Sequence, residues 1–388
     1  MRILIVSEGY GREYFGVSQV LLQLTWYLAK HGVKYEVIAA QAGDLPPEHK
    51  QRVTQLPMYA GSLRSNTLAH LIRWHPKMRS CILGRIKAFK PDVMHVHGTM
   101  TPIQLIAVNL AVREGVPVIL SPHGMLEPWL WSQKGVILGA MKRLYWNTLF
   151  KPVFKKVNYL HSITTLEQKN LAVDFPGIPQ ILISNGIAQS DIDRQSAHKA
   201  APDSSFLFVG RLHPKKGVDL LIQAFSQSDL EEDWQLQIVG PDFDPSYGAY
   251  LRQLVLRLNL EHRIHFLGSK YGDEKKDLFA RAWAAVFPSY SEVVGLVNLE
   301  AAAASTPSIT TRATGLDDWE QSGGLLIDAD PEQLTRALKA AAAWTLEERL
   351  RLGEQARKFV QEKYSWNVIG GDWVKAYRLI RESKDVIL

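Results

Sequence analysis

Residues 205–227 read SFLFVGRLHPKKGVDLLIQAFSQ and join the pattern of a β-strand to that of a helix. The first part, 205–212, is mostly apolar and suits a buried strand, whereas 218–227 has the apolar spacing of an amphipathic helix. Between them lies a basic loop, 209–217, which contains a glycine near each end. Ligands bind beyond the carboxyl ends of the strands in open parallel sheets, so this loop is a candidate binding site.

The same alternation of strand and helix patterns runs through the rest of the chain. Further strands are expected at 2–7, 35–40, 92–98, 117–124, 234–240, 263–269, 284–289 and 307–312, and further helices at 17–32 and 248–260. Such alternation is typical of parallel sheets that carry helices on both faces. We therefore expect an α/β protein made of two doubly wound, Rossmann-like domains that face each other across a cleft.

A turn signal marks the expected join between these domains. Asn185 and Gly186, within ISNGI at 183–187, form a pair that favours a tight turn. We place an N-terminal domain at 1–187 and a C-terminal domain at 188–365.

The composition is that of a globular chain and excludes several classes of protein. Of the 388 residues, 46% are hydrophobic and 22% are charged. No apolar run approaches the roughly 18 residues that a membrane span needs. The single cysteine, Cys81, excludes an internal disulfide framework and fits a reducing compartment. We therefore expect a cytoplasmic protein.

The net charge of +6 is unevenly distributed along the chain. Residues 1–187 hold 21 Lys and Arg against 10 Asp and Glu, a surplus of 11 positive charges, whereas residues 188–388 hold 24 against 29. A basic half favours an anionic partner. Because no nucleic-acid-binding motif is present, nucleic acid is not expected, and the inner face of the plasma membrane is the favoured anionic surface.

Residues 128–166 contain no Asp or Glu and concentrate basic and aromatic side chains. Two interpretations stay open for this segment. It suits the interface of an anionic membrane, but it equally suits a pair of core helices with a solvated basic face. The side chains concerned are Trp129, Trp131, Trp146, Phe150, Lys134, Lys142, Arg143, Lys151, Lys155 and Lys156.

Four positions of the loop 209–217 suit the binding of a diphosphate. Gly210 permits a tight turn after the strand, and Gly217 opens the helix. Arg211 and Lys216 place two cations five positions apart. Near a helix N-terminus, a forked guanidinium and a lysine form a clamp for a pyrophosphate. A solvated basic loop is the alternative, and the position after a strand favours the clamp.

A second stretch, PSYSEVVGLVNLEAAAASTP at 288–307, carries two glutamates eight positions apart. Burying an unpaired carboxylate is costly, so Glu292 and Glu300 need partners. Glu300, one turn into a helix, can bind a vicinal diol such as ribose, and Glu292 can reach sugar hydroxyls. A structural role is the alternative for Glu300, because the helix dipole favours an acid in the first turn. The first amides of the helix, which would be free to bind an anion, belong to Gly295, Leu296 and Val297.

Together these motifs resemble the retaining nucleotide-sugar glycosyltransferases of the GT-B fold, family 4. GRLHPKKG at 210–217 is followed by SEVVGLVNLEAAAASTPSI at 291–309, which is similar to the paired-glutamate motif of that family. The first half resembles the family in DVMHVHG at 92–98 and SPHGMLEPW at 121–129. SWNVIGGDWVKAY resembles its final helix, so the resemblance implies that residues 366–388 cross back to the first domain.

The resemblance implies a role for each candidate residue. Arg211 and Lys216 would hold the leaving diphosphate. Glu300 would bind the donor ribose, and Glu292 the hydroxyls of the transferred sugar. His123 would lie under the reacting sugar and hydrogen-bond to it. The remaining assignments are a phosphate-closing loop at Gly16, donor contacts at Gly210, Gly295, Leu296 and Val297, base-reading backbone at Lys270 and Tyr271, and the acceptor side at His97 and Gly98.

The resemblance also implies the reaction. We expect a retaining, metal-independent glycosyltransferase that moves a hexose from a nucleotide diphosphate sugar to a glycan acceptor. A lipid-linked oligosaccharide of bacterial polysaccharide synthesis is the favoured acceptor. UDP-hexoses, with UDP-glucose first, are the favoured donors, GDP-mannose is the alternative, and no cofactor is expected.

Other functions share part of this pattern. A sugar-nucleotide epimerase of the GT-B fold, or a non-catalytic binder of sugar nucleotides, would keep the clamp without an acceptor site. A nicotinamide dehydrogenase is disfavoured, because the first strand–helix turn, SEGYGREYFG at 7–16, lacks the G-x-G-x-x-G pattern.

Overall fold

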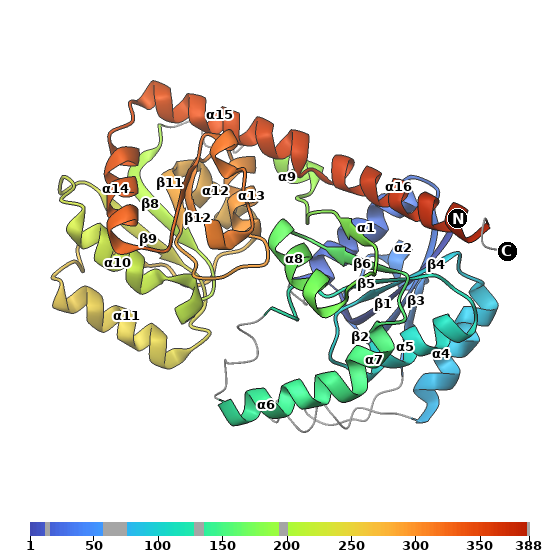
Figure 1. Ribbon diagram of the computed structural model, residues 1–388. Coiled ribbons are helices and arrows are strands. Elements are labelled where there is room, and N and C mark those ends of the chain that lie inside the picture. Colours follow the sequence, from blue (N-terminus) through green and yellow to red (C-terminus); the bar gives the residue numbers. More distant parts are fainter. Residues whose placement is uncertain (12–15, 57–75, 128–135, 194–200, 386–388) are drawn as a thin grey trace. The chain divides into compact units, whose positions relative to one another are not determined.

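The structure is a computed structural model that describes residues 1–11, 16–56, 76–127, 136–193 and 201–385 (Figure 1). Contacts divide the chain into two compact units, each of which is described by itself. The first unit comprises Met1–Ser184 with Ile369–Leu388, and the second comprises Asn185–Val368. The assignment of acceptor binding to one domain and donor binding to the other stays a prediction.

The first unit contains a seven-stranded parallel sheet in the order β3-β2-β1-β4-β5-β6-β7. The strand order reverses between β1 and β4, and open α/β sheets bind ligands at such a switch point. The strands are β1 (Arg2–Tyr10), β2 (Lys34–Ala42), β3 (Val53–Gln55), β4 (Val93–His97), β5 (Val118–Ser121), β6 (Tyr159–Ser162) and β7 (Gln180–Leu182). Its described helices include α1 (Val17–Lys30), α2 (Pro47–Lys50), α4 (Pro76–Phe89), α5 (Pro102–Arg113), α6 (Val136–Tyr145), α7 (Lys151–Phe154) and α8 (Thr165–Asp174).

The second unit contains a six-stranded parallel sheet in the order β10-β9-β8-β11-β12-β13. Its switch point lies between β8 and β11. The strands are β8 (Asp203–Val209), β9 (Gln235–Val239), β10 (Ile264–Phe266), β11 (Ala282–Phe287), β12 (Ser308–Thr311) and β13 (Leu325–Ile327). Its described helices include α9 (Gln189–Asp193), α10 (Val218–Gln227), α11 (Pro245–Arg257), α12 (Gly272–Arg281), α13 (Leu296–Ala303), α14 (Pro331–Ala342) and α15 (Leu346–Lys363). The predicted α/β class with two parallel, doubly wound sheets is confirmed.

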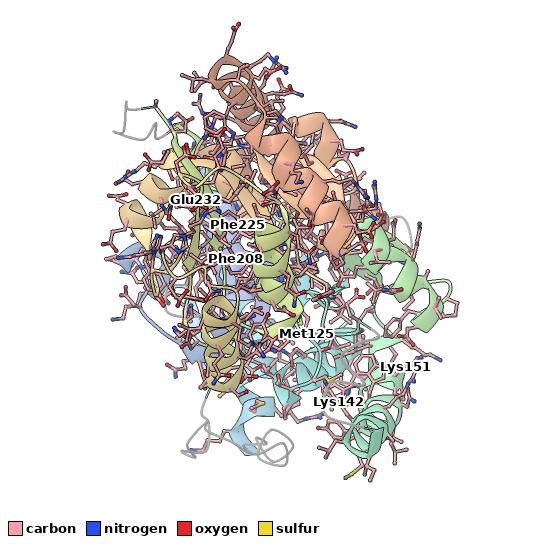
Figure 2. All side chains as sticks on the ribbon, turned by 90° about the vertical axis from the view of Figure 1, so that its left-hand side faces the viewer. Met125, Lys142, Lys151, Phe208, Phe225 and Glu232 are labelled. Carbon is pink, nitrogen blue, oxygen red and sulfur yellow. The ribbon has the colours of Figure 1, made fainter. Side chains whose placement is uncertain are left out.

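Strand β8 shows why the sequence folds in this way. Residues 206–209 are all buried, which requires cover on both faces because successive side chains of a strand point to opposite faces. Figure 2 labels Phe208 on β8 and Phe225 on α10, and both side chains belong to the buried core of the second unit. The apolar run of β8 therefore anchors the loop that follows it.

Several predicted strands extend beyond the observed ones, and two of them show the reason. The strand expected at 117–124 ends at Ser121, because Pro122 has no amide hydrogen and His123 has a positive φ of 54°. The strand expected at 263–269 is confined to Ile264–Phe266. Gly268, at φ 66°, ends the extended conformation there.

The last helix, α16 (Trp366–Asp385), contributes its residues from Ile369 onward to the first unit. Tyr377 is fully buried, and its hydroxyl lies 2.6 Å from Nδ1 of His95 on β4. The ring of Trp373 packs on His95 and on His161, with centroids 4.6 Å apart in each case. Aromatic packing and one buried hydrogen bond therefore attach this helix to the first sheet.

Replacing Tyr377 with Phe is expected to destabilise the first unit. The substitution leaves Nδ1 of His95 buried without a donor, which costs about 1–3 kcal/mol. The measurement is the urea midpoint of unfolding, followed by tryptophan fluorescence. Tyr250→Phe, at an exposed position of α11, is the matched control and should leave the midpoint unchanged. Equal midpoints for the two variants would contradict the expectation.

Candidate active site

The loops after β8 and β11 meet at the switch point of the second sheet. Gly217 has a φ of 65°, and a Cβ added there would lie 2.2 Å from the carbonyl oxygen of Pro288. Only glycine fits this contact of backbone with backbone. The amide of Tyr290 also donates to the carbonyl oxygen of Lys215, at 2.8 Å. The two motifs recognised in the sequence thus lie against each other.

Glu292 lies between two lysines of the first loop. Lys216 Nζ donates to Glu292 Oε1, and Lys215 Nζ lies 3.8 Å from Glu292 Oε2. Ser289 Oγ donates to the same carboxylate at 3.2 Å, and the Glu292 amide donates to the carbonyl oxygen of Ala313 at 2.8 Å. Burial lowers the pKa of Lys215, and the charge of Glu292 opposes that shift. Lys216 of the predicted clamp and the first predicted glutamate therefore belong to one charged cluster, together with Lys215.

Arg211 is exposed, and its guanidinium lies 4.6 Å from the ring centroid of Phe243. Such a cation–π contact stabilises by about 0.5–1 kcal/mol at an exposed site. Among the residues that the structure describes, no carboxylate forms a salt bridge with Arg211. A guanidinium has five N–H donors, so Arg211 can bind an anion while it keeps its contact with Phe243.

The start of α13 differs in part from the prediction. The helix begins at Leu296, as expected, but the amides of Gly295 and Leu296 are not free. They donate to the carbonyl oxygens of Thr314 and Val294, at 3.0 and 2.9 Å. The prediction of three free amides was therefore wrong for these two, because the loop folds back on itself and on the turn after β12. A phosphate contact at Val297 stays a prediction.

Glu300 is paired with a lysine that sequence reasoning missed. Lys275 Nζ, on α12, donates to both carboxylate oxygens of Glu300 at 2.9 Å. Lys270 and Tyr271 lie just before α12, where Lys270 forms a 3.6 Å ion pair with Glu274 and the Tyr271 side chain is exposed. A ribose at Glu300 would therefore share the carboxylate with Lys275.

The first unit carries a cluster of histidines near the carboxyl ends of β4, β5 and β6, in which His95, His97 and His161 are buried and His123 is partly buried. His97 Nδ1 lies 2.8 Å from His123 Nε2, and the rings of His95 and His97 are 3.9 Å apart. Ser121 Oγ bridges His95 Nε2 at 2.6 Å and His161 Nδ1 at 2.7 Å. The predicted residues His97 and His123 are thus in direct contact.

Hydrogen-bond directions fix the tautomers of two of these histidines. The carbonyl oxygen of Ile183 can only accept, so His161 Nε2, at 2.8 Å, carries the hydrogen. His161 Nδ1 then accepts from Ser121, whose oxygen in turn accepts from His95 Nε2. His95 Nδ1 is left to accept from the hydroxyl of Tyr377. Each donor in this chain has an acceptor when both imidazoles are neutral, and burial favours the neutral state because it lowers the pKa of His95 and of His161.

The loop after β4 leaves polar atoms without partners. His97 Nε2 and Thr99 Oγ1 are buried, and neither has a hydrogen-bond partner within the described residues. Gln104 Nε2 donates to the carbonyl oxygen of His97 at 3.1 Å, and Gly98 stands at φ 84°. Gly16, at the start of α1, is exposed. Buried polar atoms without partners are uncommon and suit a site that binds a polar ligand.

Two family models match adjoining parts of the chain. The model described as Glycosyltransferase Family 4 matches residues 15–190, and the model described as Glycosyl transferases group 1 matches residues 189–359. The chain belongs to glycosyltransferase family 4.

A relative agrees with this membership, and solved structures agree with the fold. An uncharacterized glycosyltransferase of Methanocaldococcus jannaschii is 28% identical over 405 residues, which cover 98% of this chain and 99% of the relative. Sucrose-phosphate synthase from Thermosynechococcus elongatus has a TM-score of 0.74 at 21% identity, with 98% and 99% covered. HepE of Anabaena, solved in complex with UDP and glucose, has a TM-score of 0.70 at 18% identity, with 97% and 99% covered. The predicted GT-B fold is confirmed.

This family 4 glycosyltransferase transfers a sugar from a nucleotide sugar. Sequence reasoning identified the motif residues but missed the partners that hold them, namely Ser121, His161, Lys275 and Tyr377. Within the described residues, no helix is long and apolar enough to cross a membrane.

Acidification is expected to destabilise the first unit of the glycosyltransferase. Burial lowers the pKa of His161 to about 4 and that of His123 to about 3, and it also lowers the pKa values of His95 and His97. Below about pH 6.5 the unfolded chain therefore binds more protons than the folded one. The histidines do not reduce stability above that pH. As the pH falls below it, the free energy of unfolding decreases by about 1.4 kcal/mol per pH unit for each such histidine.

Urea midpoints between pH 7.5 and 5 provide the measurement. His161→Gln removes one buried histidine and should weaken the pH dependence, whereas His265→Gln, at an exposed position of β10, should leave it unchanged. A first unit whose midpoint does not fall between pH 6.5 and 5 would contradict the assignment of neutral buried imidazoles.

Proposed function

We propose that this protein is a retaining, metal-independent hexosyltransferase that uses a UDP-hexose, with UDP-glucose favoured, and a lipid-linked glycan acceptor. The observation that carries the proposal is the cluster of Lys216 and Glu292 at the switch point of the second sheet. The likeness to HepE, solved with UDP and glucose, supports the choice of donor. GDP-mannose is the alternative donor.

The second unit contains the positively charged groups and the N–H donors that stabilise the leaving nucleotide diphosphate. Cleavage of the bond between sugar and diphosphate places negative charge on the diphosphate. Lys216 has three N–H donors, so it can keep Glu292 and still donate to a phosphate oxygen. Arg211, on the same loop, can donate to the diphosphate with its forked guanidinium. The amide of Val297 can donate to it from the N-terminus of α13.

Carboxylates bind the hydroxyls of the donor. Each carboxylate oxygen of Glu292 has two lone pairs, so lysine contacts leave acceptors for sugar hydroxyls. The same holds for Glu300, which binds the ribose beside Lys275. The backbone at Lys270 and Tyr271 reads the base.

The first unit supplies neutral groups to the sugar and the acceptor. Burial holds the pKa of His123 near about 3, so at neutral pH this imidazole forms hydrogen bonds without adding a positive charge. His97 Nε2 and the backbone at Gly98 face the acceptor. The acceptor oxygen attacks from the face that the diphosphate leaves, and its proton passes to the departing phosphate oxygen, so the configuration is retained.

Donor hydrolysis tests the role of the clamp. Nucleotide release is measured for a panel of UDP-, GDP- and ADP-hexoses, and UDP-glucose is expected to react fastest. Lys216→Met should lower kcat/KM by about 10² to 10³, the usual cost of losing a group that stabilises transition-state charge. Lys339→Met, on an exposed site of α14, is the matched control. Normal turnover of Lys216→Met would overturn the proposal.

Membrane contact is part of the proposal, because the acceptor is lipid-linked. Trp146, Phe150 and Phe154 are buried in the core of the first unit, so this part of the predicted stretch is not interfacial. On the preceding helix α6, Ile137, Met141 and Leu144 are apolar and lie at 78, 60 and 65% exposure, at a spacing that places them on one face. Trp129, Trp131 and Lys134 lie outside the described residues.

Basic residues lie on α6 and follow it along the chain. Figure 2 labels Lys142 on α6 and Lys151 at the start of α7. Lys151 pairs with Asp174 at 2.6 Å, whereas Arg143, Lys155 and Lys156 are exposed. An apolar helix face beside cations suits an anionic bilayer surface, to which each cation adds about 1 kcal/mol.

Co-sedimentation with vesicles tests this surface. The protein is expected to bind vesicles that contain phosphatidylglycerol and not vesicles of phosphatidylcholine alone. Ile137→Glu with Met141→Glu should abolish binding. Leu346→Glu with Leu350→Glu, a pair of the same spacing at exposed positions of α15, should not. Equal binding by both double variants would refute the proposed contact.

A further inference from the structure

The turn that carries His123 has a backbone conformation that needs support. His123 and Gly124 follow the end of β5 with φ angles of 54° and 72°. The left-handed conformation costs a residue with a Cβ roughly 1–2 kcal/mol. The turn has hydrogen bonds of its own, from the Met125 amide to the Pro122 carbonyl at 3.2 Å and from the Glu127 amide to the Gly124 carbonyl at 3.3 Å. Neither bond ties the turn to a neighbouring element.

A buried carboxylate makes that connection. Glu167, in the first turn of α8, is 2% exposed. Its Oε1 accepts from the amide of Gly124 at 2.7 Å, and its Oε2 accepts from the amide of Ile163 at 2.8 Å. One side chain therefore bridges the turn at His123 and the junction between β6 and α8.

This bridge is not an ordinary helix cap. Glu167 is the third residue of α8 after the N-cap Thr164, whose Oγ1 accepts from the Glu167 amide at 3.1 Å. A glutamate at this position usually accepts from the amide of the N-cap residue itself. Here its carboxylate instead reaches the residue before the cap and a different loop. The next turn of the helix repeats the connection, because Asn170 Nδ2 donates to Glu127 Oε2 at 2.9 Å.

A buried carboxylate is a costly way to stabilise a fold. Within the described residues, no Lys, Arg or His forms a salt bridge with Glu167, and burial raises its pKa while the amides of Ile163 and Gly124 lower it. Hydrogen bonds to an ionised acceptor are roughly twice as strong as neutral ones. The charge is therefore useful if the Gly124 amide has to be held firmly.

We infer that Glu167 is a positioning residue, which holds the turn at His123 so that the imidazole keeps its contact with His97 and its orientation toward the transferred sugar. The inference rests on the proposed role of His123. Glu167 itself touches neither donor nor acceptor. It should therefore affect turnover more than donor binding.

A double-mutant cycle of Glu167→Gln and His123→Ala in the full chain tests this inference. The assay is nucleotide release from the most active hexose donor of the panel. The carboxamide introduced by Glu167→Gln would present N–H groups to one of the two backbone donors, so the turn should shift. Glu167→Gln should lower kcat by about 10- to 100-fold, as small misplacements in active sites do, with the donor KM within about twofold.

The double variant decides between positioning and general destabilisation. If Glu167 acts through His123, adding Glu167→Gln to His123→Ala causes no further loss of kcat. Tyr35→Phe, which removes a buried hydrogen bond to His49 in the same unit, is the control for lost stability and should keep normal kcat. Should Glu167→Gln fail to fold, Glu167→Asp, which can reach only one of the two amides, takes its place with the same expectation.

The possible failures are distinguishable. Multiplicative losses in the double variant, or an equal loss of kcat in Tyr35→Phe, would overturn the positioning role while leaving the proposed function intact. A His123→Ala variant with unchanged kcat would instead remove the proposed role of His123, and the positioning role with it.

Discussion

The site of the second unit depends on a contact between two backbones. Gly217 faces the carbonyl of Pro288 with no room for a side chain, and the loops that meet there continue from β8 and β11, which pair as neighbours. This contact brings Lys216 to Glu292. Their attraction cannot be the main cause, because the two side chains are only 15 and 14% exposed, and the cost of desolvating a buried ion pair offsets its Coulomb attraction. Chain geometry holds the two charges together, so they are available for a ligand.

In the first unit, polar side chains are buried near the carboxyl end of the sheet and need hydrogen-bond partners there. The donor chain from Tyr377 through His95, Ser121 and His161 ends on the carbonyl of Ile183, so each member has a partner. A buried polar network stabilises a fold only when it is satisfied in this way. Within the described residues, the neighbouring His97 Nε2 and Thr99 Oγ1 have no such partner, and unsatisfied groups are expected where a fold serves a function.

Sequence reasoning could predict the elements and the motifs but not the partners. The helix expected at 218–227 matches α10, because its apolar spacing fixes both its type and its buried face. The partner of His95 lies 282 positions away, at Tyr377, and that of Glu300 lies 25 positions away, at Lys275. Such pairs depend on crossovers and side-chain directions, which periodicity does not encode. The amides of Gly295 and Leu296 were misjudged for the same reason, since their acceptors depend on how the loop folds back.

The turn after β5 shows how two unfavourable features can support each other. A left-handed conformation at His123 and a buried carboxylate at Glu167 each cost free energy when considered alone. They meet at the amide of Gly124, where one hydrogen bond gives the charge a donor and the turn an anchor. Stability alone would be served more simply by glycine at 123 and an apolar residue at 167. Because local conflicts of this kind concentrate at functional sites, their coincidence beside the predicted sugar-binding histidine favours a role in the reaction over a role in folding.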